Sequence, residues 1–279
     1  MSLYRLRILS LGAGVQSSCL LLMACLGLLP KPNLAIFADT GWESMATYAW
    51  LEWLKGEAAK AGIEVVVCGR GNIREWELSA YFRGRGGAFS VLPFHTDGAL
   101  MKRQCTNHFK IAPIRKAIRH ALGLKPRQRA PKDCVELQIG ISTDEYSRIG
   151  NYQPDRMQTV RFPLVEMGMS RWDCARWLKD HYGFVPPKSS CVGCPYHSNN
   201  EWRSLTPAEF RDACEFDRAI RNKVGLRGQA YLHRSCRPLE EVDLRTKDEK
   251  AGQLQFDFVK DEKLNLFVRG MNIHTGGQG

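Results

Sequence analysis

Short apolar runs alternate with longer amphipathic segments along much of the chain. This pattern predicts buried strands at residues 6–11, 33–38, 63–67 and 135–141, and helices at 19–29, 47–61, 113–122, 171–182 and 206–223. Strands that alternate with helices pair into a parallel sheet covered by helices. We therefore expect an α/β fold with a doubly wound, mostly parallel sheet, followed by a mainly helical C-terminal part.

The first predicted strand ends in a glycine-punctuated loop, Gly12-Ala13-Gly14, and two serines follow. A strand, a small-residue loop and a helix in this order place backbone N–H groups and a positive helix end around an anion. No Gly-Lys-Ser/Thr follows, which excludes a Walker A loop. A dinucleotide fingerprint and a loop for the pyrophosphate of ATP both remain possible, and the pair Ser17-Ser18 favours the second.

Charged side chains follow two further predicted strands. Asp39 comes directly after residues 33–38, and Asp144, Glu145 and Arg148 come after residues 135–141. Open α/β sheets bind their ligands beyond the carboxyl ends of the strands. We therefore expect these side chains at the same sheet edge as the glycine loop.

Composition narrows the class of protein. The 279 residues are 44% hydrophobic and 25% charged, which is typical of a soluble globular chain. No apolar run reaches the roughly 18 residues that a membrane span needs, and the N-terminus lacks a secretory pattern. These features predict a cytoplasmic protein without a membrane partner, in which ten cysteines do not form a disulfide framework.

Net charge adds a candidate polyanion surface. The chain carries +11, and residues 102–132 hold ten Lys and Arg without one Asp or Glu. Such a segment is either a solvated basic face or a surface for nucleic acid. The candidate contact residues are Lys102, Arg103, Lys110, Arg115, Lys116 and Arg119.

Three cysteines form a candidate metal site. Cys191 and Cys194 have the Cys-x-x-Cys spacing that lets two thiolates reach one metal, and Cys105 lies in a positive neighbourhood. Three thiolates suit a [4Fe–4S] cluster with an open position, or zinc with His108 or His197 as fourth ligand. A redox dithiol and unliganded cysteines are the alternatives.

Taken in order, these features resemble the phosphoadenosine phosphosulfate (PAPS) reductase-like family of the PP-loop ATP pyrophosphatase, or adenine nucleotide α-hydrolase-like, superfamily. The resemblance covers roughly residues 5–200 and runs through the glycine loop, Asp39-Thr-Gly-Trp-Glu43, Cys105-Thr, residues 140–148 and Cys191-x-x-Cys194. It implies a Rossmann-like (HUP-type) sheet whose first loop binds nucleotide phosphates. Its implied nucleotide-binding residues are Ser10, Gly12, Gly14, Val15, Gln16, Ser17, Ser18, Asp39, Thr40 and Gly140, and its implied catalytic residues are Asp39, Asp144, Glu145 and Arg148.

The resemblance also suggests how the chain is organised. We expect a nucleotide-binding PP-loop domain at 1–165, a helical extension with the Cys-x-x-Cys pair at 166–245, and a polar, partly disordered tail at 246–279. Two departures from the family bear on its activity. No cysteine follows Cys236 to act as the C-terminal nucleophile of the reductases, and Cys105 replaces a Cys-Cys pair.

Three functions are consistent with these features. The first is ATP-dependent adenylation of a substrate, with Mg²⁺, for sulfur or nitrogen transfer; a nucleic-acid base or backbone is the candidate substrate, and a sulfur donor protein is a candidate partner. The second is reduction of PAPS or adenylylsulfate, with an electron donor protein. The third is a non-catalytic nucleic-acid-binding subunit of a modification complex.

Overall fold

A sheet of five parallel strands forms the centre of the protein. The computed structural model describes residues 5–82, 90–97, 99–151, 154–222 and 228–250. The strands follow the order β3-β2-β1-β6-β7, and every neighbouring pair is parallel. Their bounds are Leu6–Leu11 (β1), Leu34–Asp39 (β2), Glu64–Gly69 (β3), Val135–Ile139 (β6) and Gln158–Arg161 (β7). The predicted α/β fold with a parallel sheet is confirmed.

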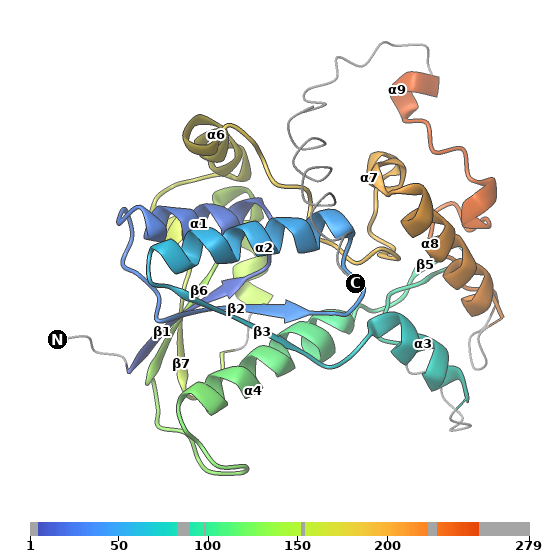
Figure 1. Cartoon of the computed structure of the whole chain (residues 1–279). Helices are drawn as coiled ribbons and strands as arrows, with labels where there is room; N and C mark the ends of the chain where they lie inside the picture. Colours follow the sequence, from blue (N-terminus) through green and yellow to red (C-terminus); the bar gives the residue numbers. More distant parts are fainter. Residues whose placement is uncertain (1–4, 83–89, 98, 152–153, 223–227, 251–279) are drawn as a thin grey trace, which may run out of the picture.

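Helices cover both faces of this sheet (Figure 1). One face packs against α1 (Val15–Cys25), α2 (Met45–Lys60) and α6 (Arg171–Tyr182), and the other against α4 (Ala112–Ala121). Alternate residues of β1 divide between the two cores, with Leu9 and Leu11 in the first and Ile8 in the second. This division follows from the two-residue period of side chains along a strand.

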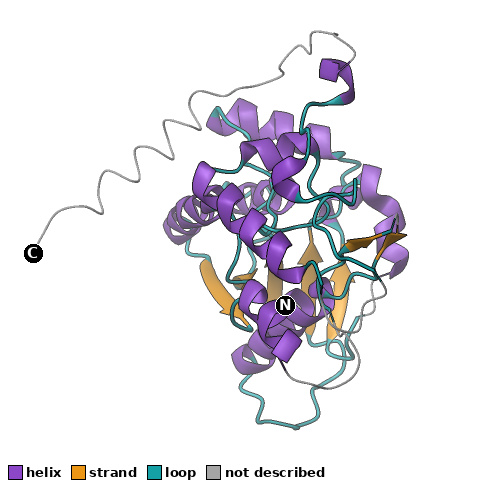
Figure 2. Ribbon diagram, turned by 90° about the vertical axis from the view of Figure 1, so that its right-hand side faces the viewer, coloured by secondary structure: helices purple, strands orange, loops and turns teal. Residues whose placement is uncertain are grey.

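A third group of elements lies beyond the carboxyl ends of the strands (Figure 1). Its main helices are α3 (Ile73–Phe82), α7 (Asn199–Ser204) and α8 (Pro207–Ile220), and the core that it shares contains Trp42, Trp202 and Phe216. Figure 2 shows it as helices and loops next to a short antiparallel hairpin. The remaining elements are β4 (His95–Thr96), β5 (Ala99–Leu100), the π-helix Thr106–Ile111, the 3-10 helices Thr143–Asn151 and Leu239–Glu241, α5 (Pro163–Glu166) and α9 (Lys247–Lys250).

Side-chain caps fix where the later helices begin. Ser170 caps α6 and Thr206 caps α8, each in a reciprocal capping box with the residue three positions on. Such boxes satisfy two backbone N–H groups that the helix itself leaves without partners. The predicted starts of these two helices are therefore confirmed.

The predicted division of the chain into three parts stays a prediction. Helix α6, which the prediction assigned to the extension, packs in the same core as α1 through Cys174 and Leu178. Most of the predicted tail, residues 251–279, lies outside the described residues. None of the described helices is long and apolar enough to cross a membrane.

The layer beyond the strand ends is joined to the sheet by a close contact at Gly193. The backbone N–H of Val192 donates to the carbonyl of Trp42 at 2.8 Å, and Glu43 and Cys191 form an antiparallel bridge. A Cβ atom placed on Gly193 would lie 2.1 Å from the Trp42 ring. The absence of a side chain at residue 193 therefore allows the Cys-x-x-Cys segment to lie flat against this indole.

We predict that Gly193→Ala lowers the free energy of unfolding by about 1–3 kcal/mol, the usual cost of overpacking a core. Gly56→Ala is the matched control, because Gly56 lies in α2 with open space around its Cβ position. That change should raise stability by about 0.5–1 kcal/mol, since alanine suits a helix better than glycine. Urea unfolding measures both, and equal effects of the two substitutions would contradict the packing argument.

Candidate functional site

The candidate site lies where the strand order of the sheet changes direction. Strands β1 and β6 are neighbours, and the chain proceeds from them toward opposite edges of the sheet. The loops that follow two such strands diverge and leave a crevice, which is where doubly wound sheets bind ligands. Here these loops are residues 12–14 and 140–142.

The first of these loops leads into the open N-terminal end of α1. Gly14 is the N-cap residue, and no described side chain caps the helix. Ala13 has a φ of 53°, in the left-handed region, and the N–H of Gly12 donates to Ser17 Oγ at 3.1 Å. Backbone N–H groups and the helix dipole are therefore available to an anion in front of Val15 and Gln16.

Gly140 brings the second loop against the first. A Cβ atom at Gly140 would lie 2.9 Å from the backbone nitrogen of Ser17 and 3.1 Å from its Cα. Backbone atoms cannot move aside as the end of a flexible side chain can, so only glycine fits here without displacing α1 or β6. The predicted role of Gly140 at the nucleotide site has this close approach as its physical basis.

Gln16 connects the switch-point loops to α6. Its side-chain nitrogen donates to Ser142 Oγ at 3.3 Å and to Glu145 Oε2 at 3.0 Å, and its oxygen accepts from Arg171 at 2.8 Å. Glu145 also pairs with Arg148 at 2.7 Å. The structure thus brings Glu145 and Arg148 together with the glycine loop, as predicted, and adds Arg171.

Asp144 lies at the edge of this network. Its carboxylate accepts the backbone N–H of Arg171 at 2.8 Å, and this bond, followed by that from Ser142, holds the pKa of Asp144 below its usual value. Asp144 is exposed, so the charge faces solvent at the mouth of the site. The group is ionised at neutral pH and can attract Mg²⁺ or a cationic group of a ligand.

Asp39 and Thr40 follow β2 on the neighbouring strand. Asp39 Oδ1 accepts the N–H of Gly41 at 2.7 Å and the hydroxyl of Tyr48 at 2.8 Å. Thr40 is fully buried and turns away from solvent toward Glu43 and the cysteine segment. Asp39 is therefore held rigidly at the sheet edge.

Two of the predicted phosphate residues point elsewhere. Ser18 is fully buried, and its hydroxyl accepts the indole N–H of Trp50 in α2 at 2.9 Å. Ser10 faces the side of the sheet that α4 covers, away from α1, where it lines a small cavity of about 40 Å³ with Arg115. Ser17 is thus the serine at the loop, while Ser18 joins α1 to α2.

The three candidate cysteines gather in one region behind the glycine loop. The segment before Cys191 touches this loop, because a Cβ atom on Gly14 would lie 3.7 Å from that of Ser189. Cys191 Sγ lies 3.1 Å from Thr40 Oγ1 and 3.9 Å from Glu43 Oε1. Cys105 and Cys194 pack against the same core.

An ion pair between a buried carboxylate and a partly exposed lysine lies beside these thiols. Lys110 Nζ is 3.5 Å from Glu43 Oε1; the Glu43 side chain is fully buried, and its Oε2 has no hydrogen-bond partner among the described residues. Burial opposes the charge on Lys110, but the charge of Glu43 favours it, and the pKa of the lysine is raised overall. Burial raises the pKa values of Cys191 and Cys194, so both are neutral thiols at pH 7.

The cysteine region does not have the geometry of a metal site. Across the described ranges, no group of three or more His, Cys, Asp or Glu side chains is arranged to hold a metal ion. His197 Nε2 lies 3.0 Å from the carbonyl oxygen of Cys191, and His108 Nδ1 is 3.4 Å from Arg70. The cluster or zinc site thus rests on sequence spacing and on the gathering of the thiols.

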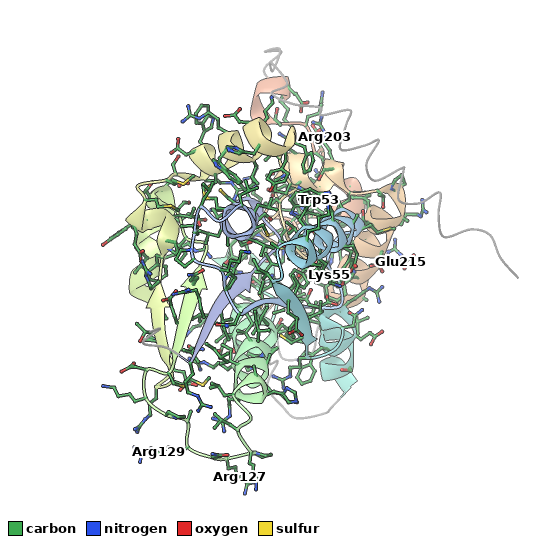
Figure 3. The ribbon with its side chains drawn as sticks, turned by 60° about the vertical axis from the view of Figure 1, so that its left-hand side comes forward. Trp53, Lys55, Arg127, Arg129, Arg203 and Glu215 are labelled. Carbon is green, nitrogen blue, oxygen red and sulfur yellow. The ribbon has the colours of Figure 1, made fainter. Side chains whose placement is uncertain are left out.

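The predicted polyanion residues are spread over several places. Lys110 faces Glu43, and Arg119 donates to the carbonyl of Gln128 at 2.7 Å. Helix α4 then carries the chain from the carboxyl edge of the sheet to its amino edge, where Figure 3 shows Arg127 and Arg129 on a projecting loop. Residues 102–132 are therefore not one continuous basic face. Lys102 and Arg103 are the exposed members near the cysteines, and the Arg103 guanidinium lies 5.4 Å from the ring of Tyr196.

Sequence reasoning missed two residues that organise the site. Glu43 was part of a motif, but its burial beside Lys110 has no local signal, because the lysine is 67 positions away. Arg171 was read as the first residue of a helix, and nothing nearby in sequence indicates its bond to Gln16.

Comparison of the chain with protein-family models and with curated proteins found no match. The likeness to the PAPS reductase-like family therefore rests on the residues and motifs of this chain. The five-stranded parallel sheet with flanking helices is compatible with a Rossmann-like fold.

We predict that Lys110→Met lowers the free energy of unfolding by about 2–3 kcal/mol at pH 7, because it leaves a buried carboxylate without its cation. The double variant Glu43→Gln/Lys110→Met should recover most of this loss. Because the pKa of Lys110 is higher in the folded than in the unfolded protein, the charged lysine stabilises the fold fully at pH values below its unfolded pKa of about 10.4. This stabilisation is lost as the pH rises through the pKa of the folded protein. The difference from wild type should therefore shrink at alkaline pH.

Lys116→Met, at an exposed lysine of α4, is the control and should change stability by less than about 0.5 kcal/mol. Chemical denaturation across a pH series gives all of these values. A double variant as unstable as Lys110→Met would show that the two side chains are not coupled.

The metal prediction is tested by analysis of anaerobically purified protein. We expect about four iron atoms per chain, with matching sulfide, if the thiols hold a [4Fe–4S] cluster. Cys194→Ser should lose this iron, whereas Cys68→Ser, at a half-buried thiol in β3, should retain it. One zinc per chain would assign the thiols to zinc instead, and metal-free protein would contradict both versions.

Proposed function

We propose that the protein is a PP-loop enzyme, similar to the PAPS reductase-like family, that uses ATP to adenylate a substrate for sulfur or nitrogen transfer. The observation that carries this proposal is the open N-terminal end of α1 at the switch point of the sheet, with Gly140 packed against its first turn. An oxygen of the substrate attacks the α-phosphorus, and the bond to the bridging oxygen breaks. Pyrophosphate leaves, and the incoming sulfur or nitrogen then displaces AMP.

The glycine loop suits the leaving pyrophosphate. Fixed N–H groups that face developing negative charge stabilise it without reorganisation, and this effect is among the largest in catalysis. Ser17 holds the loop in shape through its bond to Gly12, and Gln16 positions Arg171 beside it. Mg²⁺ bound to ATP would neutralise further phosphate charge.

The cysteine segment favours sulfur chemistry over other uses of ATP. It lies directly behind the glycine loop, with Ser189 next to Gly14, so thiols and nucleotide phosphates share one region. The Ser189 hydroxyl is buried without a hydrogen-bond partner among the described residues, which makes it a donor for a ligand at this contact. Lys110 supplies a positive charge beside Cys191, which lowers the pKa of this thiol, although burial raises it more.

Exposed aromatic side chains around the site support a nucleic-acid substrate. Tyr146, next to Glu145, is 64% exposed, and Trp172, next to Arg171, is 67% exposed. The Arg176 guanidinium lies 4.6 Å from the Trp172 ring. Aromatic and guanidinium faces stack on unpaired bases, and this stacking stabilises single strands on many proteins.

The structure gives less support to sulfonucleotide reduction. That reaction needs a thiolate nucleophile, but burial keeps Cys191 and Cys194 protonated. Cys236, the last cysteine, lies in the segment around His233 rather than beside the glycine loop. Sulfite release from PAPS or adenylylsulfate with a thioredoxin-like donor would nevertheless establish this alternative.

We predict that the protein converts ATP to AMP and pyrophosphate when a nucleic-acid substrate is present. Ser17→Ala should slow this conversion by about 10²-fold, because the loop loses the bond that shapes it and the phosphates shift. Ser79→Ala, at an exposed serine of α3, is the control and should leave the rate unchanged. Radiolabelled ATP with separation of AMP and ADP measures both.

The same assay separates the alternatives. ADP in place of AMP would contradict adenylation. Nucleic-acid binding without any turnover of ATP would instead assign the protein to the non-catalytic class of subunits in a modification complex.

A further inference from the structure

A second cavity lies outside the candidate nucleotide site, in the C-terminal part of the chain. Its volume is about 500 Å³, and it opens between the start of α7, residues 233–237 and residues 242–250. Cavities of this size hold ligands much larger than a single phosphate ion. Neither the glycine loop nor the three cysteines contribute to its lining.

The lining is rich in hydrogen-bond donors and positive charge. Four basic side chains, Arg234, Arg237, Arg245 and Lys250, line it together with one acid, Asp243. Burial, followed by the charges of Arg234, His95 and Lys250, lowers the pKa of His233 to about 4, so its imidazole is neutral at pH 7. The cavity therefore carries a net positive charge, which comes from its arginines and lysine.

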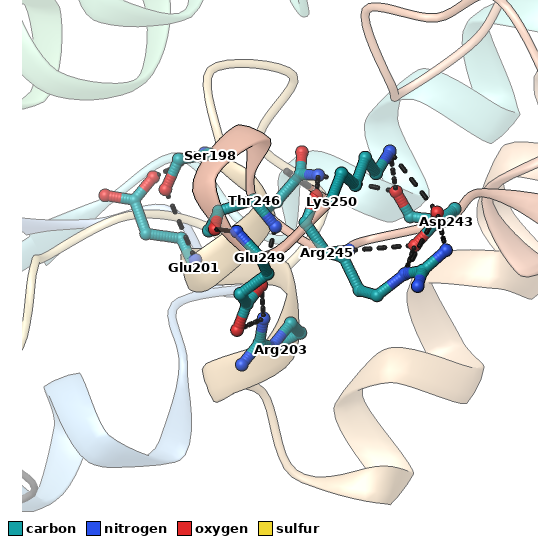
Figure 4. Close-up of polar contacts among 9 residues, drawn as sticks. Ser198, Glu201, Arg203, Asp243, Arg245, Thr246, Glu249 and Lys250 are labelled. Carbon is teal, nitrogen blue, oxygen red and sulfur yellow. Dashed lines mark hydrogen bonds and ion pairs between the residues drawn. The ribbon is translucent and has the colours of Figure 1, made fainter. Parts of the chain in front are cut away.

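Polar contacts between segments hold this lining in place. Asp243 pairs with Arg245 at 2.8 Å and with Lys250 at 3.4 Å, and Arg203 of α7 pairs with Glu249 (Figure 4). Asn199 Oδ1 accepts from His233 Nε2 at 3.2 Å, and the Asn199 side-chain nitrogen donates to the carbonyl of Arg245 at 2.9 Å. The cavity is therefore built before any ligand arrives, which reduces the entropy cost of binding.

Two of the arginines remain available to a ligand. Arg234 has no carboxylate partner among the described residues, and Arg237 is 3.9 Å from Glu241, a separation too long for a direct hydrogen bond. A guanidinium matches the geometry of phosphate oxygens through two parallel N–H groups. We propose that this cavity binds phosphodiester groups of a single-stranded nucleic acid through Arg234 and Arg237.

This proposal deepens the proposed function and rests on it only for the identity of the substrate. The start of α7 connects the cavity to the cysteine segment: Asn199 lines the cavity, and His197, two residues earlier, contacts the carbonyl of Cys191. A strand held at the cavity would therefore be anchored beside the thiols. Phosphate contacts of this kind position a strand and carry no sequence information.

The test is the binding of a fluorescent single strand of about 12 nucleotides to the full-length protein without ATP, followed by anisotropy over a salt series. Arg234→Ala/Arg237→Ala should weaken binding about tenfold, through the loss of two charge-assisted hydrogen bonds. It should also lower the slope of log K against log salt by about 1.4, since each phosphate contact on a single strand contributes about 0.7. Lys55→Ala/Lys60→Ala removes the same charge from α2 and should change neither value.

Further variants and ligands make the result decisive. Arg234→Lys/Arg237→Lys keeps both charges and should restore the slope, with only part of the affinity, because lysine lacks the planar fork. A strand with uncharged methylphosphonate linkages should bind wild type weakly. Equal binding of natural and uncharged strands, or an arginine double variant that matches the α2 control, would overturn the proposal.

A small-anion site and a failed proposed function each give a distinct result. Tight binding of inorganic phosphate that is lost in Arg234→Ala/Arg237→Ala, with strand binding unaffected, would mean a small-anion site and would overturn the nucleic-acid assignment. The binding assay contains no ATP, so absence of AMP formation would overturn adenylation while leaving the cavity result intact. If Arg234→Ala/Arg237→Ala forms AMP normally and binds the strand as wild type does, the cavity proposal is overturned and the proposed function is not.

Discussion

The close approach of Gly140 to the first turn of α1 sets the geometry of the whole switch point. A side chain at residue 140 would lie 2.9 Å from the nitrogen of Ser17, so the residue that follows β6 must be glycine. This approach brings Ser142 and Glu145 within reach of Gln16, which in turn holds Arg171 of α6. The absence of a side chain at residue 140 thus brings the loop after β6 against the first turn of α1 at the switch point of the sheet.

A second glycine, Gly193, allows the cysteine segment to pack close to the switch point. Gly193 lies against Trp42, and the bridge between Glu43 and Cys191 continues that contact toward β2. Glu43 therefore combines a backbone role with a buried charge that needs Lys110 beside it. Loss of the lysine would affect the cysteine segment and the layer beyond the strands together, because the same few residues join them to the sheet.

Much of the fold could be predicted from local sequence. The period of apolar residues located β1, β2, β3 and β6 but not β7, and the capping residues located the starts of α6 and α8. The predicted start of the first helix, residue 19, is wrong: α1 begins at Val15. The prediction places Ser17 and Ser18 in the loop as donors, whereas both lie in the first turn of the helix. Ser18 is in fact buried by its bond to Trp50, 32 positions away, and a burial of that kind leaves no pattern in the neighbouring residues.

Charge along the chain proved a poor guide to charge in space. Residues 102–132 are basic throughout, yet α4 divides them between opposite edges of the sheet. The arginines of the second cavity are instead interspersed with Glu240, Glu241 and Asp243, so their segment looks electrically mixed in sequence. A net charge of +11 attracts a polyanion from a distance, but screening limits that attraction to about 8 Å in physiological salt. A polyanion binds where arginine side chains are not closely paired with a carboxylate. Which arginines these are depends on the folded structure and not on their order in the sequence.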